Sequence, residues 1–591
     1  MSRLRPLLCC ERLFAAAKAV SMKFLCVLCV LCGFSLCSFA LDREAFTFTN
    51  YDLTVRIEPE QQRLAVRGKI TLRNDSARPQ TNLALQISSS LDWRSVRVNG
   101  KAAHFVTQEY NSDIDHTGAL SEAIVNPPEA IPPKGRIEVE VGYEGVIPLD
   151  TSRLTRIGVP EDKAKHTDWD QISNAFTAVR GIGYVVWYPV ATEDASLSEG
   201  NSVAETIGRW QEREAPADFK TVLKYSRATG DPPPELLCSG IQTKEIYEQM
   251  GRAQLVSLDC DFSGAGLHVP TFTAANFQKL AANEAVGVHY LPQQESAAKD
   301  YAEVAAQIEP LSLGSSKPPS LQMIALPESD DQRFVTGSML LTPLNSPMTN
   351  EAELSIVYAK ARQLVPSPRA WIQDGLAHFA QAEFIEKQKG RPAAIEYLQS
   401  HATALITAEK DAPKMSVDQQ SSHSLINAPD DLYLQTKAMY VWWMLRDTLG
   451  SLPVDALRDY RAAEDKEPTY LPGLIGKQTS RDLQWFFDDW VYHDRGLPDF
   501  RVASVFATPI QTGGFLVTIN VENLGNAGAE VPLTLEFEGG EMRKRLEVHA
   551  KSTASLRMES PGVPQRVTVN DGSVPETDMT NNTYKIEVSK H

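Results

Sequence analysis

The stretch PRAWIQDGLAHFAQAEFIEKQKG, residues 368–390, carries apolar side chains three and four residues apart and ends on a glycine. This spacing predicts an amphipathic helix with one buried face. The same pattern recurs in ESAAKDYAEVAAQIEPL (295–311), EAELSIVYAKARQLV (351–365), KAMYVWWMLRDTLG (437–450) and SRDLQWFFDDWVYHDRG (480–496). We therefore expect residues 263–500 to form a mainly helical domain, with one short strand at LQMIALP (321–327).

Alternating apolar and polar residues on both sides of this region predict half-buried strands. The alternation begins at 51–57, recurs to about residue 262 with no long helix expected to interrupt it, and returns at 515–521 and 533–537. These patterns predict an N-terminal antiparallel β domain over 41–262 and a C-terminal β-sandwich over 501–591. The fold class expected is therefore α+β, with several domains.

Residues 1–40 differ in kind from the rest of the chain. Met22 and Lys23 precede the apolar run FLCVLCVLCGFSLCSFA, which ends with small residues at Ser38 and Ala40. A positive charge, an apolar stretch and small residues at these positions predict a signal peptide cleaved near Ala40, with residues 1–21 as an upstream segment. The protein would then be exported to a periplasm or the extracellular space. If the run stays uncleaved, it would instead anchor the chain in a membrane.

The charge of the chain bears on its partners. The 591 residues carry a formal net charge of -17, and the acidic residues are spread along the sequence. Binding to nucleic acid relies on a basic surface that neutralises phosphates, so we expect no nucleic-acid partner.

Eight cysteines are present, and six of them lie in the first 40 residues. The two that remain, Cys238 and Cys260, flank a segment that reads as a hairpin. In an exported protein such a pair forms a disulfide, and the alternative is two unpaired thiols.

Four segments, in order along the chain, resemble the aminopeptidase N family of gluzincin zinc metallopeptidases. IALPESDDQRFVTGSMLLTPL (324–344) resembles the strand with that family's G-A-M-E-N motif, which binds the amino terminus of the substrate. WIQDGLAHF (371–379) resembles W-L-N-E-G-F-A-x-[YF], whose glutamate is the third zinc ligand. KAMYVWWMLRDTLG and LQWFFDDWVYHDRGLPDF (483–500) resemble the family's late helices. The resemblance implies a thermolysin-like helical domain and places Asp374 at the third-ligand position.

The zinc motif of the family is missing. A gluzincin holds Zn²⁺ with two histidines one helical turn apart in H-E-x-x-H, whose glutamate is the general base. No such motif occurs in this sequence. The family's usual spacing would place it on Glu351–Ser355, and a shorter connection would place it on Tyr358–Arg362, which we prefer. In the second case Arg362 would pair with Asp374 or would point to solvent.

Other positions that the resemblance assigns to catalysis also differ. Gly337, Ser338, Met339 and Leu340 match the substrate-binding motif, with leucine where the family has its amino-binding glutamate. The tyrosine that stabilises the tetrahedral intermediate corresponds to Gln435, and Tyr433 would replace it only if the loop shifts. Asp374 and His378 are one helical turn apart, which leaves two alternatives: a weak metal site, or a histidine that is solvated or satisfied within its helix, as such residues more often are.

These observations leave three functions open. The first is a non-catalytic scaffold without cofactor that binds a peptide or a protein in the interdomain cleft. The second is an active metallopeptidase that holds zinc with altered ligands. The third is a structural protein that self-associates through its C-terminal sandwich.

Overall fold

The computed structural model describes residues 41–200, 202–228, 233–250, 253–313, 320–411, 424–427, 430–493, 495–511 and 513–587. The predicted signal peptide lies outside these ranges. The predicted fold class is confirmed, because a β region, a helical region and a second β region follow one another along the chain. Within the described ranges, no helix has the length and apolar character needed to span a bilayer.

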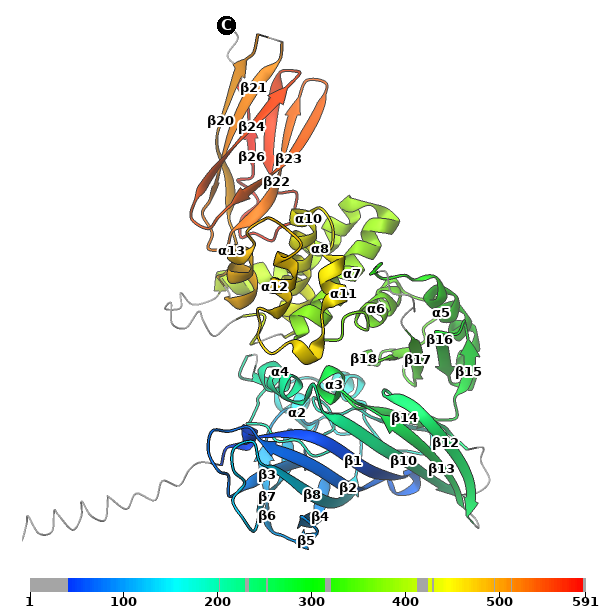
Figure 1. The fold of residues 1–591 in the computed structure, drawn as a ribbon. Coiled ribbons are helices and arrows are strands. Elements are labelled where there is room, and N and C mark those ends of the chain that lie inside the picture. The colour runs from blue at the N-terminus through cyan, green and yellow to red at the C-terminus, as the bar shows by residue number, and fades with distance from the viewer. Residues whose placement is uncertain are drawn as a thin grey trace, which may run out of the picture. The chain divides into compact units, whose positions relative to one another are not determined.

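An eight-stranded sheet dominates the N-terminal region (Figure 1). Its order is β12-β13-β10-β1-β2-β8-β4-β5, and its neighbouring strands run antiparallel apart from the parallel pair β1 and β10. Apolar residues of alternating position, such as Leu53, Val55 and Ile57, are fully buried under it. The strands are β1 (Phe46–Glu58), β2 (Arg63–Asn74), β4 (Leu91–Val98), β5 (Lys101–Ala102), β8 (Arg136–Val146), β10 (Asp218–Ala228), β12 (Ile241–Met250) and β13 (Ala253–Asp261).

Two three-stranded sheets complete this region. One has the order β3-β7-β6, with β3 (Leu83–Ser88), β6 (His104–Asn111) and β7 (Ala119–Asn126). The other has the order β11-β14-β9, with β9 (Phe176–Val179), β11 (Glu235–Cys238) and β14 (Phe272–Ala275). Because β14 pairs with β9 and β11, the N-terminal β region continues past the expected boundary at residue 262.

The expectation that no long helix interrupts these strands is wrong. Helix α4 (Ser202–Glu214) has 13 residues, and it buries Trp210 while most of its other side chains are polar. Its few apolar residues are interspersed with charged ones and give no clear helical pattern. The alternating pattern of the neighbouring strands was therefore extended across this helix. Two short helices, α2 (Ser152–Arg156) and α3 (Glu161–Thr167), and the single-turn 3₁₀ helices Arg43–Ala45, Pro59–Gln61 and Ala265–Leu267 also occur here.

The region after β14 opens with a sheet of five strands, although only one strand was expected. Its order is β15-β16-β17-β19-β18, and β17 runs parallel to both β16 and β19. Helix α5 (Glu295–Gln307) packs against it through Ala298, Tyr301 and Ala305. The strands are β15 (Gln278–Ala281), β16 (Val286–Tyr290), β17 (Leu321–Leu326), β18 (Phe334–Thr336) and β19 (Met339–Pro343), with a 3₁₀ turn at Pro292–Gln294.

The predicted helices follow this sheet. Thr349 begins α6 by accepting a hydrogen bond from the amide of Ala352 at 3.2 Å, which is the usual role of an N-cap threonine. Gly450 ends α10 in the left-handed conformation that glycine adopts freely. The helices are α6 (Asn350–Ala361), α7 (Ala370–Lys389), α8 (Arg391–Asp411), the π-helix η5 (Tyr433–Ala438), α10 (Met439–Leu449), α11 (Val454–Asp459), the 3₁₀ turn Ala462–Glu464, α12 (Tyr470–Gly476), α13 (Gln484–Phe487) and the π-helix η7 (Asp488–Tyr492).

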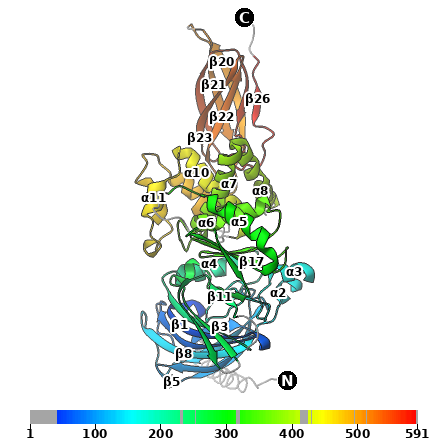
Figure 2. The same ribbon diagram turned by 90° about the vertical axis from the view of Figure 1, so that its right-hand side faces the viewer.

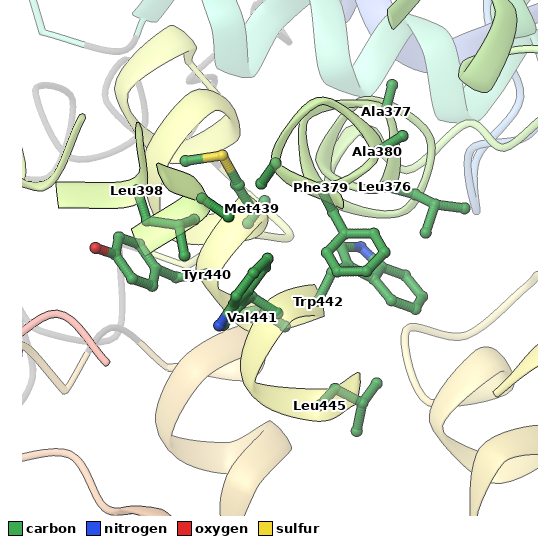
Figure 3. Close-up of a cluster of buried hydrophobic side chains, with 14 of the residues drawn as sticks. Leu376, Ala377, Phe379, Ala380, Leu398, Met439, Tyr440, Val441, Trp442 and Leu445 are labelled. Atoms are coloured by element: carbon green, nitrogen blue, oxygen red, sulfur yellow. The ribbon is translucent and has the colours of Figure 1, made fainter. Parts of the chain in front are cut away.

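The centre of the helical region is a cluster of aromatic and aliphatic side chains from α7, α8 and α10 (Figure 3). Trp371 and Trp442 stack with ring centroids 5.7 Å apart, and Trp442 Nε1 donates to the carbonyl of Trp371 at 3.0 Å. Gly375 permits this close packing, because a Cβ there would lie 2.7 Å from Cβ of Ala438. The aromatic residues Tyr440, Trp442 and Trp443 are fully buried and belong to this core.

The C-terminal strands form two facing sheets (Figure 2). One has the order β20-β21-β24 and the other β23-β22-β25-β26. Val517, Ile519, Leu533 and Leu535 alternate along β21 and β22 and are fully buried between the sheets. The strands are β20 (Phe500–Pro509), β21 (Phe515–Asn523), β22 (Ala529–Phe537), β23 (Gly540–Val548), β24 (Thr553–Ser560), β25 (Pro564–Val569) and β26 (Thr583–Lys585).

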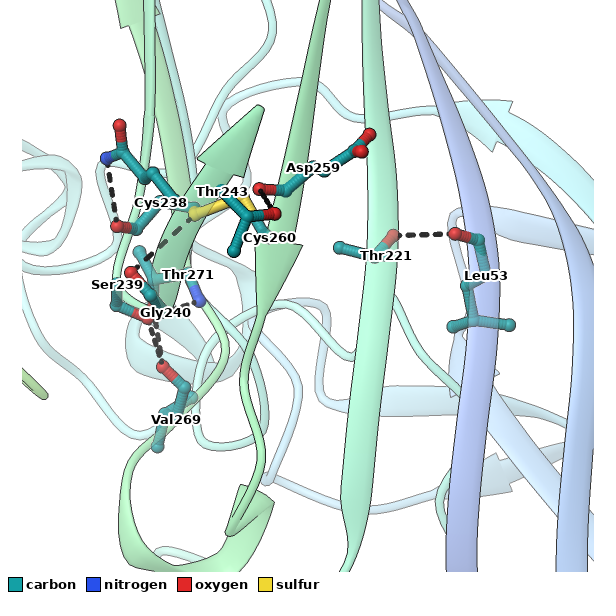
Figure 4. Close-up of a disulfide and its surroundings, with 11 residues drawn as sticks. Leu53, Thr221, Cys238, Ser239, Gly240, Thr243, Asp259, Cys260, Val269 and Thr271 are labelled. Carbon is teal, nitrogen blue, oxygen red and sulfur yellow. Dashed lines mark hydrogen bonds between the residues drawn. A yellow bond between two sulfur atoms is a disulfide. The ribbon is translucent and has the colours of Figure 1, made fainter. Parts of the chain in front are cut away.

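Cys238 and Cys260 form a disulfide (Figure 4). Cys238 is the last residue of β11, and Cys260 lies near the end of β13. The bond therefore joins the small β11-β14-β9 sheet to the eight-stranded sheet.

Candidate functional site

A cleft of about 930 Å³ lies where the N-terminal β region meets the helical region. We call it the cleft, and most of its lining residues fall into three sets. The first set comes from β11, β12 and the turn between them, the second from β17 and the Gly337–Met339 turn, and the third from the α6–α7 connection and the start of α7. The cleft is also lined by Asp261, Ser263, Leu267, His268, Lys279 and His289. Cys238 and its neighbours Ser239 and Gly240 belong to the first set, and Figure 4 shows them beside the disulfide.

Asp374 lies in the first turns of α7, behind the third set of lining residues. Its side chain is buried, and its Oδ1 atom accepts two hydrogen bonds. One comes from the hydroxyl of Tyr358 and the other from Nε of Arg362, each at 2.5 Å. Tyr358 and Arg362 stand one helical turn apart at the end of α6, so both face the same carboxylate.

The structure thus separates the two placements that the sequence left open. Arg362 pairs with Asp374 and does not point to solvent. Glu351 instead accepts a hydrogen bond from Arg333 at 2.8 Å, and Ser355 donates to the carbonyl of Glu351 at 2.8 Å. Tyr358 and Arg362, at the end of α6, are therefore the residues that contact Asp374.

Burial and pairing fix the protonation states of this cluster. Burial alone would lower the pKa of Arg362, but the charge of Asp374 and its hydrogen bond outweigh burial and hold that pKa above its usual value. Burial, followed by the negative charge of Asp374, raises the pKa of the Tyr358 phenol well above its usual value. At neutral pH the cluster consequently holds a charged guanidinium and a neutral phenol.

Two histidines lie beside the cluster. His378, one turn after Asp374, packs its ring 4.7 Å from that of Tyr358, and its Nδ1 atom is 2.9 Å from Oε1 of Gln381. Burial lowers the pKa of His378 to about 4. His268 lines the cleft, and burial together with the charge of Arg362 lowers its pKa to about 4. Both imidazoles are neutral at pH 7, and His268 is a site residue that no sequence motif indicated.

The donor set at Asp374 does not fit Zn²⁺. Zinc requires nitrogen, thiolate or carboxylate ligands that can present an unshared electron pair. Arg362 presents a permanent cation and Tyr358 a protonated phenol, and neither is one of these ligands. Both already donate hydrogen bonds to Oδ1 of Asp374. The described hydrogen bond of His378 is to Gln381 and its ring packs on Tyr358, and neither contact joins it to Asp374. Within the described ranges, no three His, Cys, Asp or Glu side chains are grouped as metal ligands.

The positions that match the substrate-binding motif lie in the turn before β19 and in its first two residues. Gly337, Ser338 and Met339 line the cleft. Leu340 does not: it is fully buried in the core on the other face, because successive residues of a strand point to opposite sides. Gly337 adopts φ +53, and a Cβ at this position would lie 2.6 Å from the carbonyl oxygen of Ser239. Glycine therefore allows the two walls of the cleft to approach.

The two candidates for the intermediate-stabilising position lie in η5. Gln435 is exposed and Tyr433 is half-buried, with Nζ of Lys437 5.9 Å from its ring centroid. The described residues that line the cleft include neither of them. Gln373 is instead a lining residue that the sequence did not single out, and its amide donates to the carbonyl of Arg362 at 3.2 Å.

Comparison with known proteins finds solved structures with a similar fold. No protein-family profile and no curated protein matches the sequence. The chain is similar to aminopeptidase A of Legionella pneumophila in complex with aspartic acid, with a TM-score of 0.59 and 13% identity over 91% of this chain and 59% of that chain. An M1 zinc metallopeptidase of Deinococcus radiodurans gives a TM-score of 0.48 and 13% identity over 78% of this chain and 96% of that one. The chain therefore has the aminopeptidase N-like fold.

Proposed function

We propose that this aminopeptidase N-like chain is a non-catalytic binding protein that uses its cleft to hold a peptide or a segment of a partner protein. The observation that carries the proposal is the shared contact of Arg362 and Tyr358 with Oδ1 of Asp374. The positive charge that a zinc ion would supply in a metallopeptidase is supplied here by a guanidinium. A guanidinium cannot bind and activate a water molecule as zinc does.

The glutamate that serves as general base in the family also has no counterpart beside Asp374 among the described residues. If Tyr358 and Arg362 stand where the family has its two histidines, the catalytic glutamate corresponds to Ala359. Ala359 has no titratable group and is 1% exposed. Loss of the metal ligands and the base together supports a site without hydrolytic activity.

The lining of the cleft is suited to a polar chain. Glu235, Glu245 and Asp261 contribute carboxylates, while Lys279 and Arg362 contribute cations. Ligand pockets combine such oriented polar groups with apolar walls, and Leu236, Ile324 and Met339 supply the apolar part here. A peptide, whose backbone both donates and accepts hydrogen bonds, matches this mixture.

Export is part of the proposal. The predicted signal peptide implies a compartment outside the cytoplasm. A disulfide between Cys238 and Cys260 is consistent with such a compartment, since thiols stay reduced in the cytosol.

Metal analysis combined with an activity assay tests the proposal. The protein is purified without chelator, its zinc content is measured by mass spectrometry, and it is incubated with a panel of aminoacyl and peptide substrates. We expect far less than one equivalent of zinc and no cleavage. About one equivalent of tightly bound zinc, with cleavage that a chelator abolishes and Asp374→Asn removes, would instead establish an active metallopeptidase with altered ligands.

A further inference from the structure

A second concave region lies on the face of the eight-stranded sheet that carries polar side chains. It has a volume of about 810 Å³, and β1, β2, β4, β8, β10 and β13 contribute to its lining. None of its lining residues lines the cleft. We call it the basic hollow, because its charged lining residues are Arg56, Arg63, Arg67, Arg94, Lys224 and Glu144.

The charge of the basic hollow is opposite to that of the chain. Five cations and one carboxylate line it, whereas the whole chain has a formal net charge of -17. Three of the arginines have carboxylate partners: Arg63 and Arg94 both bind Glu144, and Arg56 lies 2.8 Å from Glu58. For Arg67 and Lys224 the described part of the chain supplies no ion pair. A net positive charge therefore remains in the hollow.

The strand register places two cations next to each other. Arg56 of β1 stands opposite Lys224 of the parallel strand β10, and the two side chains share the outer face of the sheet. Like charges directly opposite each other destabilise a sheet. An anionic ligand that bridges them would remove this repulsion.

Space for such a ligand comes from Gly142 in β8. Gly142 stands between Arg67 of β2 and Ser95 of β4 in the register of the sheet. A Cβ at residue 142 would lie 2.7 Å from the hydroxyl of Ser95. The absence of a side chain keeps the floor of the hollow open beside Arg67.

We propose that the basic hollow binds an acidic peptide segment of a partner protein through the carboxylates of aspartate or glutamate side chains. Glu144 shows the mode of recognition, because its carboxylate already accepts hydrogen bonds from Arg63 and from Nε of Arg94. Arginine recognises carboxylates through its planar array of donors. The hydroxyls of Thr54, Ser95 and Ser226 add further donors to the lining.

The lining argues against nucleic acids and for a peptide. Single-stranded nucleic acids bind by stacking bases on exposed aromatic rings. The one aromatic residue that the structure places in the lining, Tyr143, is 2% exposed and donates its hydroxyl to the carbonyl of Trp187. It offers no stacking surface.

Fluorescence anisotropy with a labelled octaglutamate peptide tests the proposal, with octalysine as the control peptide. Octaglutamate is expected to bind at low salt and to be released as salt increases, and octalysine is expected not to bind. The variant Arg67→Glu/Lys224→Glu should weaken octaglutamate binding about tenfold or more, because it places like charges against the ligand. Lys101→Glu, an equal change of charge at an exposed position outside the hollow, should leave binding within about twofold of the parent.

Further controls make the result decisive. Circular dichroism and the thermal midpoint of each variant confirm that it is folded, and Arg67→Gln/Lys224→Gln provides a milder pair of substitutions whose loss of binding should be smaller. Competition with a single-stranded oligonucleotide and with vesicles of anionic lipid identifies the source of the anion. The proposal is overturned if octaglutamate does not bind, if Lys101→Glu weakens binding as much as the double variant does, or if only the oligonucleotide or the vesicles bind.

Discussion

Arg362 and Asp374 are joined by a hydrogen bond of 2.5 Å from Nε to Oδ1, and their side chains are only 10% and 11% exposed. The two residues come from successive helices, α6 and α7, at the point where the chain turns between them. A charged pair in such a place is held by mutual attraction against the cost of removing both groups from water. Breaking it therefore has consequences that can be measured.

Removal of one partner should destabilise the protein. Arg362→Met leaves the carboxylate of Asp374 buried without its cation, and we expect a loss of about 3–5 kcal/mol in unfolding free energy. The double variant Arg362→Met/Asp374→Leu should recover much of this loss, since it removes both charges. As a control, Arg333→Met breaks an ion pair with Glu351, whose side chain is 80% exposed, and should cost about 1 kcal/mol or less. Chemical denaturation followed by tryptophan fluorescence measures all three, and equal losses for Arg362→Met and Arg333→Met would contradict the prediction.

Introducing two histidines and a glutamate beside Asp374 should create a zinc site. The variant Tyr358→His/Ala359→Glu/Arg362→His introduces two imidazoles one helical turn apart, and the two replaced side chains both contact Asp374. Such an arrangement with a carboxylate is the ligand set of a gluzincin. We expect about one equivalent of bound zinc by mass spectrometry, which should fall when Asp374→Ala is added. The variant Glu351→His/Ser355→His, built on the other placement, serves as the control and should bind no zinc with this dependence on Asp374.

Glu214 should make stability depend on pH. This carboxyl is completely buried at the end of α4, where Oε1 accepts from the amide of Phe48 and from Nε of Arg213, while Oε2 has no hydrogen-bond partner. Burial raises the pKa of Glu214 from 4.5 to about 7. Between these values the folded state binds a proton that the unfolded state has lost, so the stability from this group is complete below pH 4.5 and is lost as pH rises through 7.

The measurement is the thermal midpoint of Glu214→Gln and of the parent across this pH range. The amide removes the titration, so Glu214→Gln should gain stability relative to the parent as pH rises, by roughly 3 kcal/mol over the window. Glu205→Gln, a half-exposed position on the same helix, should follow the parent at every pH. If the difference between Glu214→Gln and the parent does not change with pH, burial of the charged form is not what governs this site.

Gly375 should tolerate no side chain. A Cβ at this position of α7 would lie 2.7 Å from Cβ of Ala438, so Gly375→Ala forces α7 and η5 apart, and we expect a loss of about 1–3 kcal/mol. A Cβ at Gly473, in α12, would meet no other atom within 4 Å. Gly473→Ala should therefore be neutral or should stabilise by up to about 1 kcal/mol, because alanine favours helix over glycine. Thermal unfolding of the pair distinguishes steric contact from helix propensity.

The sequence was most informative where one residue pattern implied one structure. The spacing of apolar residues predicted α7 and α10, and the alternation at 515–537 predicted the C-terminal strands. Residue patterns did not predict the five-stranded sheet. Its strands β15 and β18 have only four and three residues, which is too few for an alternating pattern to be recognised. Long-range pairs such as β1 with β10, which are 160 residues apart or more, leave no local signal.

The candidate site shows the same limit. The family resemblance singled out Asp374 and left two possible partner pairs, but the choice between them depended on how α6 approaches α7. His268 and Gln373 enter the site through tertiary packing, and neither stands in a recognisable pattern. Leu340 matched a motif position, yet the pleat of β19 turned its side chain into the core.

The disulfide has a mechanical consequence for the cleft. Cys238 lies in one wall, and its bond to Cys260 fastens that wall to β13 and so to the whole eight-stranded sheet. If the cleft widened on that side, the eight-stranded sheet would have to move together with the wall. In the described part of the chain, the opposite wall with the Gly337–Met339 turn and the α6–α7 connection carries no disulfide, so the covalent bracing of the cleft is one-sided.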